Sequence, residues 1–124
     1  MGTKRILIID DEPAIRQIVQ ISLKAIAQWE VLLAASGQEG IAMAMAELPD
    51  AILLDVMMPE MDGISTFKQM QTNPVLQSIP TIFLTAKAQS TEKHLFTELA
   101  IIGVITKPFK APDLVQQMRS LLSW

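Results

Sequence analysis

Short apolar runs alternate along the chain with longer segments whose apolar residues recur at helical spacing. The runs, which we expect to form strands, cover residues 6–9, 30–34, 51–54, 81–84 and 104–106. The segments of helical spacing predict helices over residues 13–28, 36–46, 64–71, 91–99 and 112–122. Buried strands that alternate with helices are typical of a parallel sheet covered by helices on both faces. We therefore predict an α/β fold.

The ends of the predicted helices carry residues that favour a start or a stop. Pro13 and Pro112 suit the first turn of a helix. Ser36, with Glu39 three residues later, has the form of a capping box. The pair Asn73–Pro74 is expected to break the helix that precedes it.

Length and composition favour one domain, residues 1–124, with a core of its own. The chain has 124 residues, of which 50% are hydrophobic and 19% are charged. It has no cysteine, which excludes disulfides and thiolate metal sites and makes the cytoplasm the expected location. The apolar run before Asp10 is too short for a signal peptide or a membrane span. The net charge of -3, without a run of Lys or Arg, argues against nucleic acid as a partner.

Polar side chains follow the predicted strands at the edge where an open α/β sheet binds ligands. Asp10 and Asp11 follow the first strand, Asp55 the third, Thr85 the fourth and Lys107 the fifth. Carboxylates that meet at one edge repel one another unless a cation compensates their charge. Because the ligands are hard oxygens with no His or Cys near them in the sequence, we expect Mg²⁺ in octahedral geometry.

Each of these residues also has a purely structural interpretation. Asp10 and Asp11 could cap the helix that follows them, although a cap accounts for one carboxylate and not for two. Thr85 is a common residue type at the end of a strand, and Lys107 taken alone could be a solvated charge. His94, the only histidine, is expected on the surface of its helix rather than in phosphate transfer.

Several ordered motifs resemble the signature of the bacterial two-component response-regulator receiver domain, in its chemotaxis-regulator-like single-domain form. The motifs are Ile9–Asp10–Asp11–Glu12, Leu54–Asp55–Val56–Met57–Met58–Pro59 with Asp62–Gly63, Leu84–Thr85–Ala86, and Thr106–Lys107–Pro108–Phe109. Any one motif is weak, but the ordered set is specific and covers essentially the whole chain. The resemblance implies a flavodoxin-like (βα)5 three-layer sandwich whose five parallel strands have the order 2-1-3-4-5.

The resemblance also implies a role for each carboxylate at the predicted edge. Asp55 would be the phosphoacceptor. It would bind Mg²⁺ directly, together with Asp11 and the backbone carbonyl of Met57. Asp10 would act mainly through water.

The remaining residues of the edge would hold the phosphoryl group once it arrives. Thr85 would hydrogen-bond the phosphoryl oxygens, and Lys107 would contact them as a point charge. The Lys107–Pro108 peptide bond would be cis, which can direct the lysine inward.

The implied function is a phosphoacceptor signalling switch in a phosphorelay. The donor would be a histidine kinase or a histidine phosphotransfer protein, and the output would be a protein–protein contact. Phosphoryl transfer depends mostly on positioning and charge stabilisation, so no general-base histidine is required. We expect no enzymatic activity beyond this self-phosphorylation and a slow self-dephosphorylation. Met57 and Lys87 are candidates to control the access of water during self-dephosphorylation.

Three alternatives remain open at this point. The chain could be a degenerate receiver that serves as a constitutive interaction module, or a receiver excised from a longer regulator. A hydrolase with an aspartyl-phosphate intermediate is disfavoured, because such enzymes typically carry a second Asp two residues after the nucleophile. Here that position is Met57.

Two features depart from the usual pattern of the family. Val104 stands where many receivers carry Tyr or Phe, so the aromatic part of their switch cannot operate here in its usual form. Coupling would then rely on Thr85 and on aliphatic repacking. Residues 99–103 are also more aliphatic than usual, which predicts an output and homodimer surface on the helix 91–99, the strand 104–106 and the helix 112–122. Its residues would include Phe96, Leu99, Ile102 and Val104.

Overall fold

Five parallel strands form the centre of the molecule. The computed structural model describes residues 3–86 and 100–124. The strands are β1 (Arg5–Ile9), β2 (Glu30–Ala34), β3 (Ala51–Asp55), β4 (Thr81–Thr85) and β5 (Gly103–Thr106). They form one sheet in the order β2-β1-β3-β4-β5, and all four pairings are parallel. This confirms the predicted fold class and strand order, and no predicted strand boundary is off by more than one residue.

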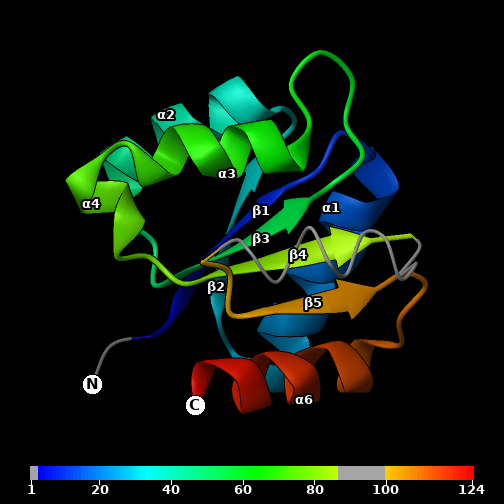
Figure 1. Cartoon of the computed structure of the whole chain (residues 1–124). Helices are drawn as coiled ribbons and strands as arrows, with labels where there is room; N and C mark the ends of the chain where they lie inside the picture. Colours follow the sequence, from blue (N-terminus) through cyan, green and yellow to red (C-terminus); the bar gives the residue numbers. More distant parts are fainter. Residues whose placement is uncertain (1–2, 87–99) are drawn as a thin grey trace.

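Helices cover both faces of this sheet (Figure 1). One face carries α1 (Pro13–Ser22), its π-helical extension η1 (Leu23–Ala27) and α6 (Ala111–Leu122). The other face carries α2 (Gly37–Glu47), α3 (Gly63–Gln71) and α4 (Pro74–Gln77). The result is the predicted three-layer sandwich.

The core consists of two apolar clusters, one on each face of the sheet. In β1, Ile6 and Ile8 belong to the cluster beneath α1 and α6, whereas Leu7 and Ile9 belong to the cluster beneath α2 and α3. Strand β3 alternates in the same way. Because both faces are covered, the middle positions of the central strands are apolar in succession rather than at alternate positions.

Side chains cap three of the described helices. The Ser36 hydroxyl accepts a hydrogen bond from the Glu39 N–H at 3.1 Å, as the capping box predicts, and Asp62 accepts one from the Ser65 N–H at 2.7 Å. As predicted, the helix that precedes Asn73–Pro74 ends before this pair, but the pair also has a second role. Asn73 accepts a hydrogen bond from the Val75 N–H at 2.9 Å and thereby starts the short helix α4.

Helix α1 ends in a π-helical turn that the sequence pattern did not predict. The turn closes at Gln28, which has a left-handed backbone with φ of 59°. The chain then enters β2 through Trp29, a buried residue whose ring packs edge-on against Trp124 at a centroid distance of 5.2 Å.

The predicted helix over residues 91–99 lies outside the described residues, as do Lys87, His94, Phe96 and Leu99. Within residues 3–86 and 100–124, no helix combines the length and the apolarity needed to cross a membrane.

Candidate functional site

The register of the sheet brings several chemically active side chains to one edge. Ile9 lies beside Leu54, so Asp10 comes level with Asp55 at the ends of β1 and β3. On the other side of β3, Thr85 ends β4 opposite Thr106 of β5. The arrowheads in Figure 1 all point toward this edge, which is reached by the loops that follow β1, β3 and β5.

Three carboxylates meet at this edge. Asp10, Asp11 and Asp55 each place a carboxylate oxygen within 4.8 Å of the others. Asp10 has 0% of its surface exposed and Asp55 has 2%, whereas Asp11 is half-buried. Buried carboxylates are costly without compensating charge, so the cluster differs from an ordinary solvated group of acids.

Lys107 supplies one positive charge to this cluster. Its Nζ lies 2.9 Å from Oδ2 of Asp10 and 3.2 Å from Oδ1 of Asp55. The Lys107 backbone N–H donates to the carbonyl of Thr85 at 2.7 Å, which continues the β4–β5 pairing by one residue. The Lys107–Pro108 peptide bond is cis.

Burial and mutual charge interactions shift the pKa values of Asp55 and Lys107. Burial, together with the neighbouring Asp10 carboxylate, raises the pKa of Asp55 to about 6, although Lys107 and the Met57 N–H both act to lower it. Burial alone would lower the pKa of Lys107, but its hydrogen bonds and charge interactions with Asp10 and Asp55 outweigh that effect and raise it. One ammonium group therefore compensates the cluster only in part.

The loop between β1 and α1 is held by side chains on both sides. Oδ1 of Asp10 accepts a hydrogen bond from the Glu12 N–H at 2.9 Å. The N-cap of α1 is Glu12, which has no side-chain capping bond, so the interpretation of Asp10 and Asp11 as helix caps is wrong. From inside the helix, Nη1 of Arg16 donates to the carbonyl of Asp10 at 2.7 Å. The sequence pattern did not identify Arg16, because its contact depends on how the loop folds back over α1.

The loop between β3 and α3 covers the other side of the cluster. The backbone N–H of Met57 donates to the Asp55 carboxylate, and the Met57 side chain is 70% exposed. The loop closes where the Gly63 N–H donates to the Val56 carbonyl at 3.0 Å. A side chain at position 63 would collide with the backbone of Asp55, so this close approach requires glycine.

The fold and the residues at the carboxyl ends of the strands are those of a known family. The family described as response regulator receiver domain matches residues 6–119. The chain belongs to this family. The resemblance drawn from the motifs is therefore confirmed, and the receiver fold explains why the acidic residues and Lys107 come from strands far apart in the sequence.

Relatives and solved receivers extend the comparison. The alkaline phosphatase synthesis transcriptional regulatory protein PhoP of Bacillus subtilis is 35% identical over 96% of this chain, and 48% of PhoP is covered. The chain thus spans about half the length of the curated relatives it matches. The chemotaxis protein CheY4 of Vibrio cholerae superposes with a TM-score of 0.91 at 29% identity, covering 97% of this chain and 99% of CheY4.

A third comparison bears on the fold alone, because the identity is 24%. The receiver domain of the sensor histidine kinase PA1611 from Pseudomonas aeruginosa superposes with a TM-score of 0.87, covering 99% of this chain and 100% of that one. That structure is described as having a magnesium ion coordinated in its active site cleft.

The remaining predicted residues of the receiver lie along β4 and β5. Thr85 is buried at the end of β4, beside the acidic cluster. Val104 is half-buried in β5 and packs against the apolar cluster that contains Phe83, its partner in the register. Ile102, just before β5, is 37% exposed. Position 104 is therefore occupied by an aliphatic rather than an aromatic side chain, as the sequence indicated.

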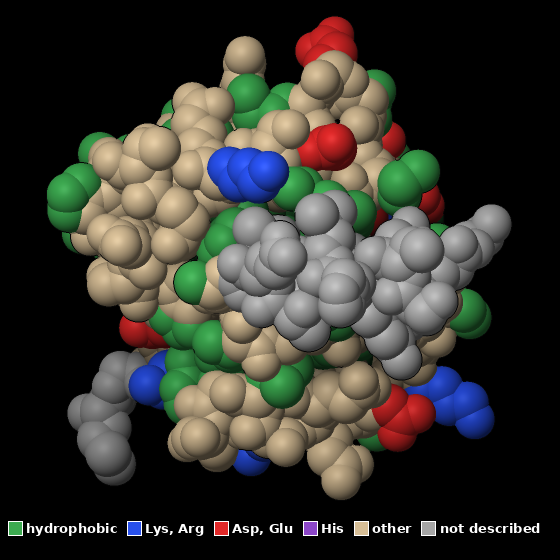
Figure 2. All heavy atoms as spheres, viewed as in Figure 1, with side chains coloured by type: hydrophobic (Ala, Val, Ile, Leu, Met, Phe, Trp, Pro, Cys, Tyr) green, Lys and Arg blue, Asp and Glu red, His purple; other side chains and the backbone are tan. Residues whose placement is uncertain are grey.

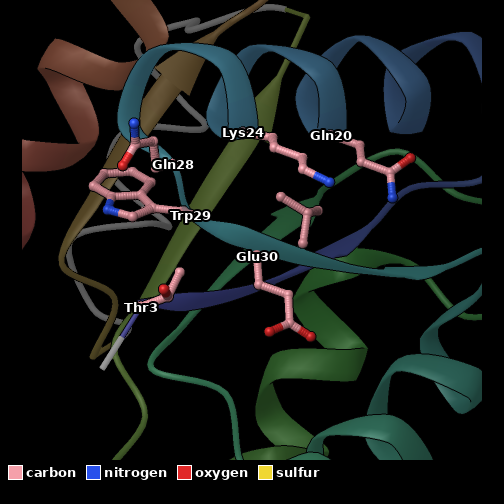
Figure 3. A pocket seen from close by; sticks show the side chains of 7 residues that line it. Thr3, Gln20, Lys24, Gln28, Trp29 and Glu30 are labelled. Atoms are coloured by element: carbon pink, nitrogen blue, oxygen red, sulfur yellow. The ribbon is translucent and has the colours of Figure 1, made fainter. Parts of the chain in front are cut away.

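A hollow at the opposite end of the sheet has a different character. Its volume is about 570 Å³, and its lining residues are Thr3, Gln20, Lys24, Gln28, Trp29, Glu30 and Val31 (Figure 3). Both charge types line it, and most of these side chains are exposed. On the described part of the face in Figure 2, Lys and Arg side chains are separated from one another and form no continuous basic surface.

Proposed function

We propose that this receiver is a phosphoacceptor switch that takes a phosphoryl group on Asp55. One observation carries the proposal: a buried carboxylate lies 3.2 Å from a lysine ammonium and within 4.8 Å of two further carboxylates. Groups that serve only stability are rarely arranged so that a buried charge stays partly uncompensated. We also propose that the domain acts in the cytoplasm, where its phosphodonors are found.

The proposed transfer balances without an added acid or base. A carboxylate oxygen of Asp55 forms a bond to phosphorus while the bond from phosphorus to the imidazole nitrogen of the donor breaks. The electron pair of that bond stays on the imidazole nitrogen, and the proton carried by the other ring nitrogen of the phosphorylated donor makes the departing group a neutral imidazole. Since its pKa is about 6, Asp55 is mainly ionised at neutral pH and ready to attack. Lys107 offsets charge on the phosphoryl oxygens, and the hydroxyl of Thr85 donates to one of them.

The acidic cluster fits a divalent cation. Its donors are hard carboxylate oxygens, and Lys107 alone leaves the three carboxylates with a net negative charge. We propose that Asp11, Asp55 and the backbone carbonyl of Met57 hold Mg²⁺ directly and that Asp10 acts through water. When bound, the ion supplies positive charge that offsets the charge developing during phosphoryl transfer.

The proposed donor is a histidine kinase or a histidine phosphotransfer protein, and α1 offers a surface for it. Ile18 and Ile21 lie on the exposed face of this helix, with 47% and 67% of their surface exposed. Helix α1 starts two residues after Asp11, so a helix packed on this face lies close to the cluster. Ile21→Asp is expected to slow transfer from a histidine donor but not from acetyl phosphate, which needs no docking surface. If Ile21→Asp and the unchanged protein accept the phosphoryl group from the histidine donor at the same rate, this face is excluded as the docking surface.

The proposed output is a protein contact or a homodimer at β5 and the elements beside it. Ile102 is exposed there, and Val104 packs against the core without the aromatic ring that many receivers carry. Ile102→Asp should weaken self-association or partner binding without lowering phosphorylation. Val75→Asp on α4 is the matched control, since Val75 is also an exposed apolar residue, with 49% of its surface exposed against 37% for Ile102. An unchanged binding constant for Ile102→Asp would exclude this surface.

The decisive test of the proposed function is phosphorylation by a small donor. The protein is incubated with acetyl phosphate and Mg²⁺, and its mass is followed with time. We expect the gain of one phosphoryl group, dependent on Mg²⁺ and lost in Asp55→Asn. The control Asp113→Asn removes an exposed carboxylate in α6 and should behave like the unchanged protein.

The same experiment separates the alternatives. A degenerate receiver would take up no phosphoryl group at any Mg²⁺ concentration. A hydrolase would consume acetyl phosphate continuously, without a lasting gain in mass. Either outcome would contradict the proposed switch.

A further inference from the structure

Arg16 reaches back from the first turns of α1 to the peptide that joins two aspartates of the acidic cluster. Its Nη1 donates a hydrogen bond to the carbonyl of Asp10 at 2.7 Å. Its backbone N–H bonds to the Glu12 carbonyl at 3.2 Å, so the residue is anchored in the helix while its side chain crosses the β1–α1 loop. The phosphoryl transfer proposed above assigns it no role.

The carbonyl that Arg16 contacts belongs to a fully buried residue. The N–H of Asp10 donates to the Ala34 carbonyl at 3.1 Å, and its carboxylate accepts hydrogen bonds from the Glu12 N–H and from Lys107. With Arg16 on the carbonyl, every polar group of Asp10 has a partner. A buried carbonyl that loses its partner is costly, so the loop would rearrange without the guanidinium.

The same contact also constrains Asp11. A peptide bond is planar, so the carbonyl of Asp10 and the N–H of Asp11 turn together. The hydrogen bond from Arg16 to this carbonyl therefore fixes the orientation of the peptide plane, and with it the position from which the Asp11 side chain extends. That side chain provides one of the three carboxylate oxygens that lie within 4.8 Å of one another.

We propose that Arg16 is a positioning residue for the divalent-cation site: through the Asp10 carbonyl it holds Asp10 and Asp11 at the spacing that Mg²⁺ requires. This inference rests on the proposed function, which places the cation among these carboxylates. Mg²⁺ demands near-ideal octahedral geometry, whereas Ca²⁺ accepts flexible and irregular ligand sets. Loss of a positioning residue therefore weakens Mg²⁺ binding more than Ca²⁺ binding. Loss of a positive charge alone would instead strengthen the binding of both cations, because it removes repulsion between Arg16 and the ion.

The test measures Mg²⁺ and Ca²⁺ dissociation constants of the full chain by titration calorimetry. Arg16→Met removes the contact, and Arg119→Met is the matched control. Arg119 lies on α6 with its guanidinium 5.6 Å from the Trp29 ring centroid, at the opposite end of the sheet. Arg16→Met should weaken Mg²⁺ binding about tenfold, the size of one charge-assisted hydrogen bond. It should weaken Ca²⁺ binding by no more than about threefold, and Arg119→Met should change neither.

Two conservative variants sharpen the result. Arg16→Lys keeps the charge and one donor but not the planar fork, so part of the Mg²⁺ preference should return. If Arg16→Met fails to fold, as circular dichroism would show, Arg16→Gln replaces it and should show the same selective loss of Mg²⁺.

An equal loss for both ions, or an unchanged Mg²⁺ affinity, would overturn the role of Arg16. If the unchanged protein itself binds no Mg²⁺, the proposed function fails as well. If the unchanged protein binds Mg²⁺ and Arg16→Met binds it equally well, only the present inference fails.

Discussion

The two ends of the sheet each gather carboxylates around one basic side chain, but they do so in different surroundings. At the amino end, Arg5 contacts Glu47 at 2.6 Å and Glu30 at 3.9 Å, and its backbone N–H donates to Asp50. All three acids are exposed there. At the carboxyl end, Lys107 meets Asp10 and Asp55, which are almost completely buried.

The difference shows that burial, rather than the number of charges, perturbs the carboxylates of a cluster. Water screens the carboxylates around Arg5, so their mutual repulsion costs little. The carboxylates around Lys107 lack that screening, and the pKa of Asp55 rises to about 6 as a result. The proposed function places a cation and a phosphoryl group at the carboxyl end, whereas the exposed acids at the amino end are compensated by Arg5 and by water.

Removing the basic residue from each end should produce the largest contrast. Lys107→Met leaves two buried carboxylates without their partner and should lower the free energy of unfolding by about 3–5 kcal/mol. Arg5→Met breaks exposed pairs and should lower it by at most about 1 kcal/mol. Urea denaturation without divalent ions at neutral pH measures both. Equal losses would show that burial does not separate the two ends.

The raised pKa of Asp55 should make the free energy of unfolding depend on pH. Its pKa is about 6 in the folded protein and 3.8 without the fold, so the folded state retains a proton that the unfolded state has lost. As pH rises through 6, this advantage disappears and the free energy of unfolding falls. Asp55→Asn lacks this loss and should become more stable than the unchanged protein by roughly 1–3 kcal/mol at neutral pH. Near pH 4 the two should converge, and parallel curves from pH 4 to 8 would contradict this account.

The smallest expected effect concerns packing at the amino end. The edge-on contact of Trp29 with Trp124, extended by Lys4 at 4.6 Å from the Trp124 ring centroid, holds the start of β2 against the end of α6. Trp124→Leu should lower the free energy of unfolding by about 0.5–1.5 kcal/mol. Phosphorylation by acetyl phosphate should stay unchanged. A loss of phosphorylation would show that the two ends are coupled.

The hydrophobic pattern predicted the described strands and most of the helices, because strands buried on both faces are continuous apolar runs. It did not predict α4, since a helix from Pro74 to Gln77 is too short to show a period and depends on the Asn73 cap. The π-helical turn after Ser22 was also missed, because its apolar residues fit an α-helical period equally well.

The candidate site followed from the order of polar residues at the strand ends, because parallel strands bring those ends together. What the order could not provide was the depth of burial, which decides the pKa of Asp55. Nor could it provide Arg16, whose contact with the Asp10 carbonyl is set by the path of the β1–α1 loop. Contacts of this kind depend on tertiary geometry rather than on spacing.

In the proposed switch, a divalent cation and a phosphoryl group share the buried cluster around Asp55. Fluorine NMR of the protein with beryllofluoride, recorded during a Mg²⁺ titration, detects both partners in one experiment. We expect bound-fluoride signals that appear only with Mg²⁺ and are absent from Asp55→Asn. An unchanged protein that gives no bound signal at saturating Mg²⁺, or an Asp55→Asn variant that gives the same signals, would contradict the proposed switch.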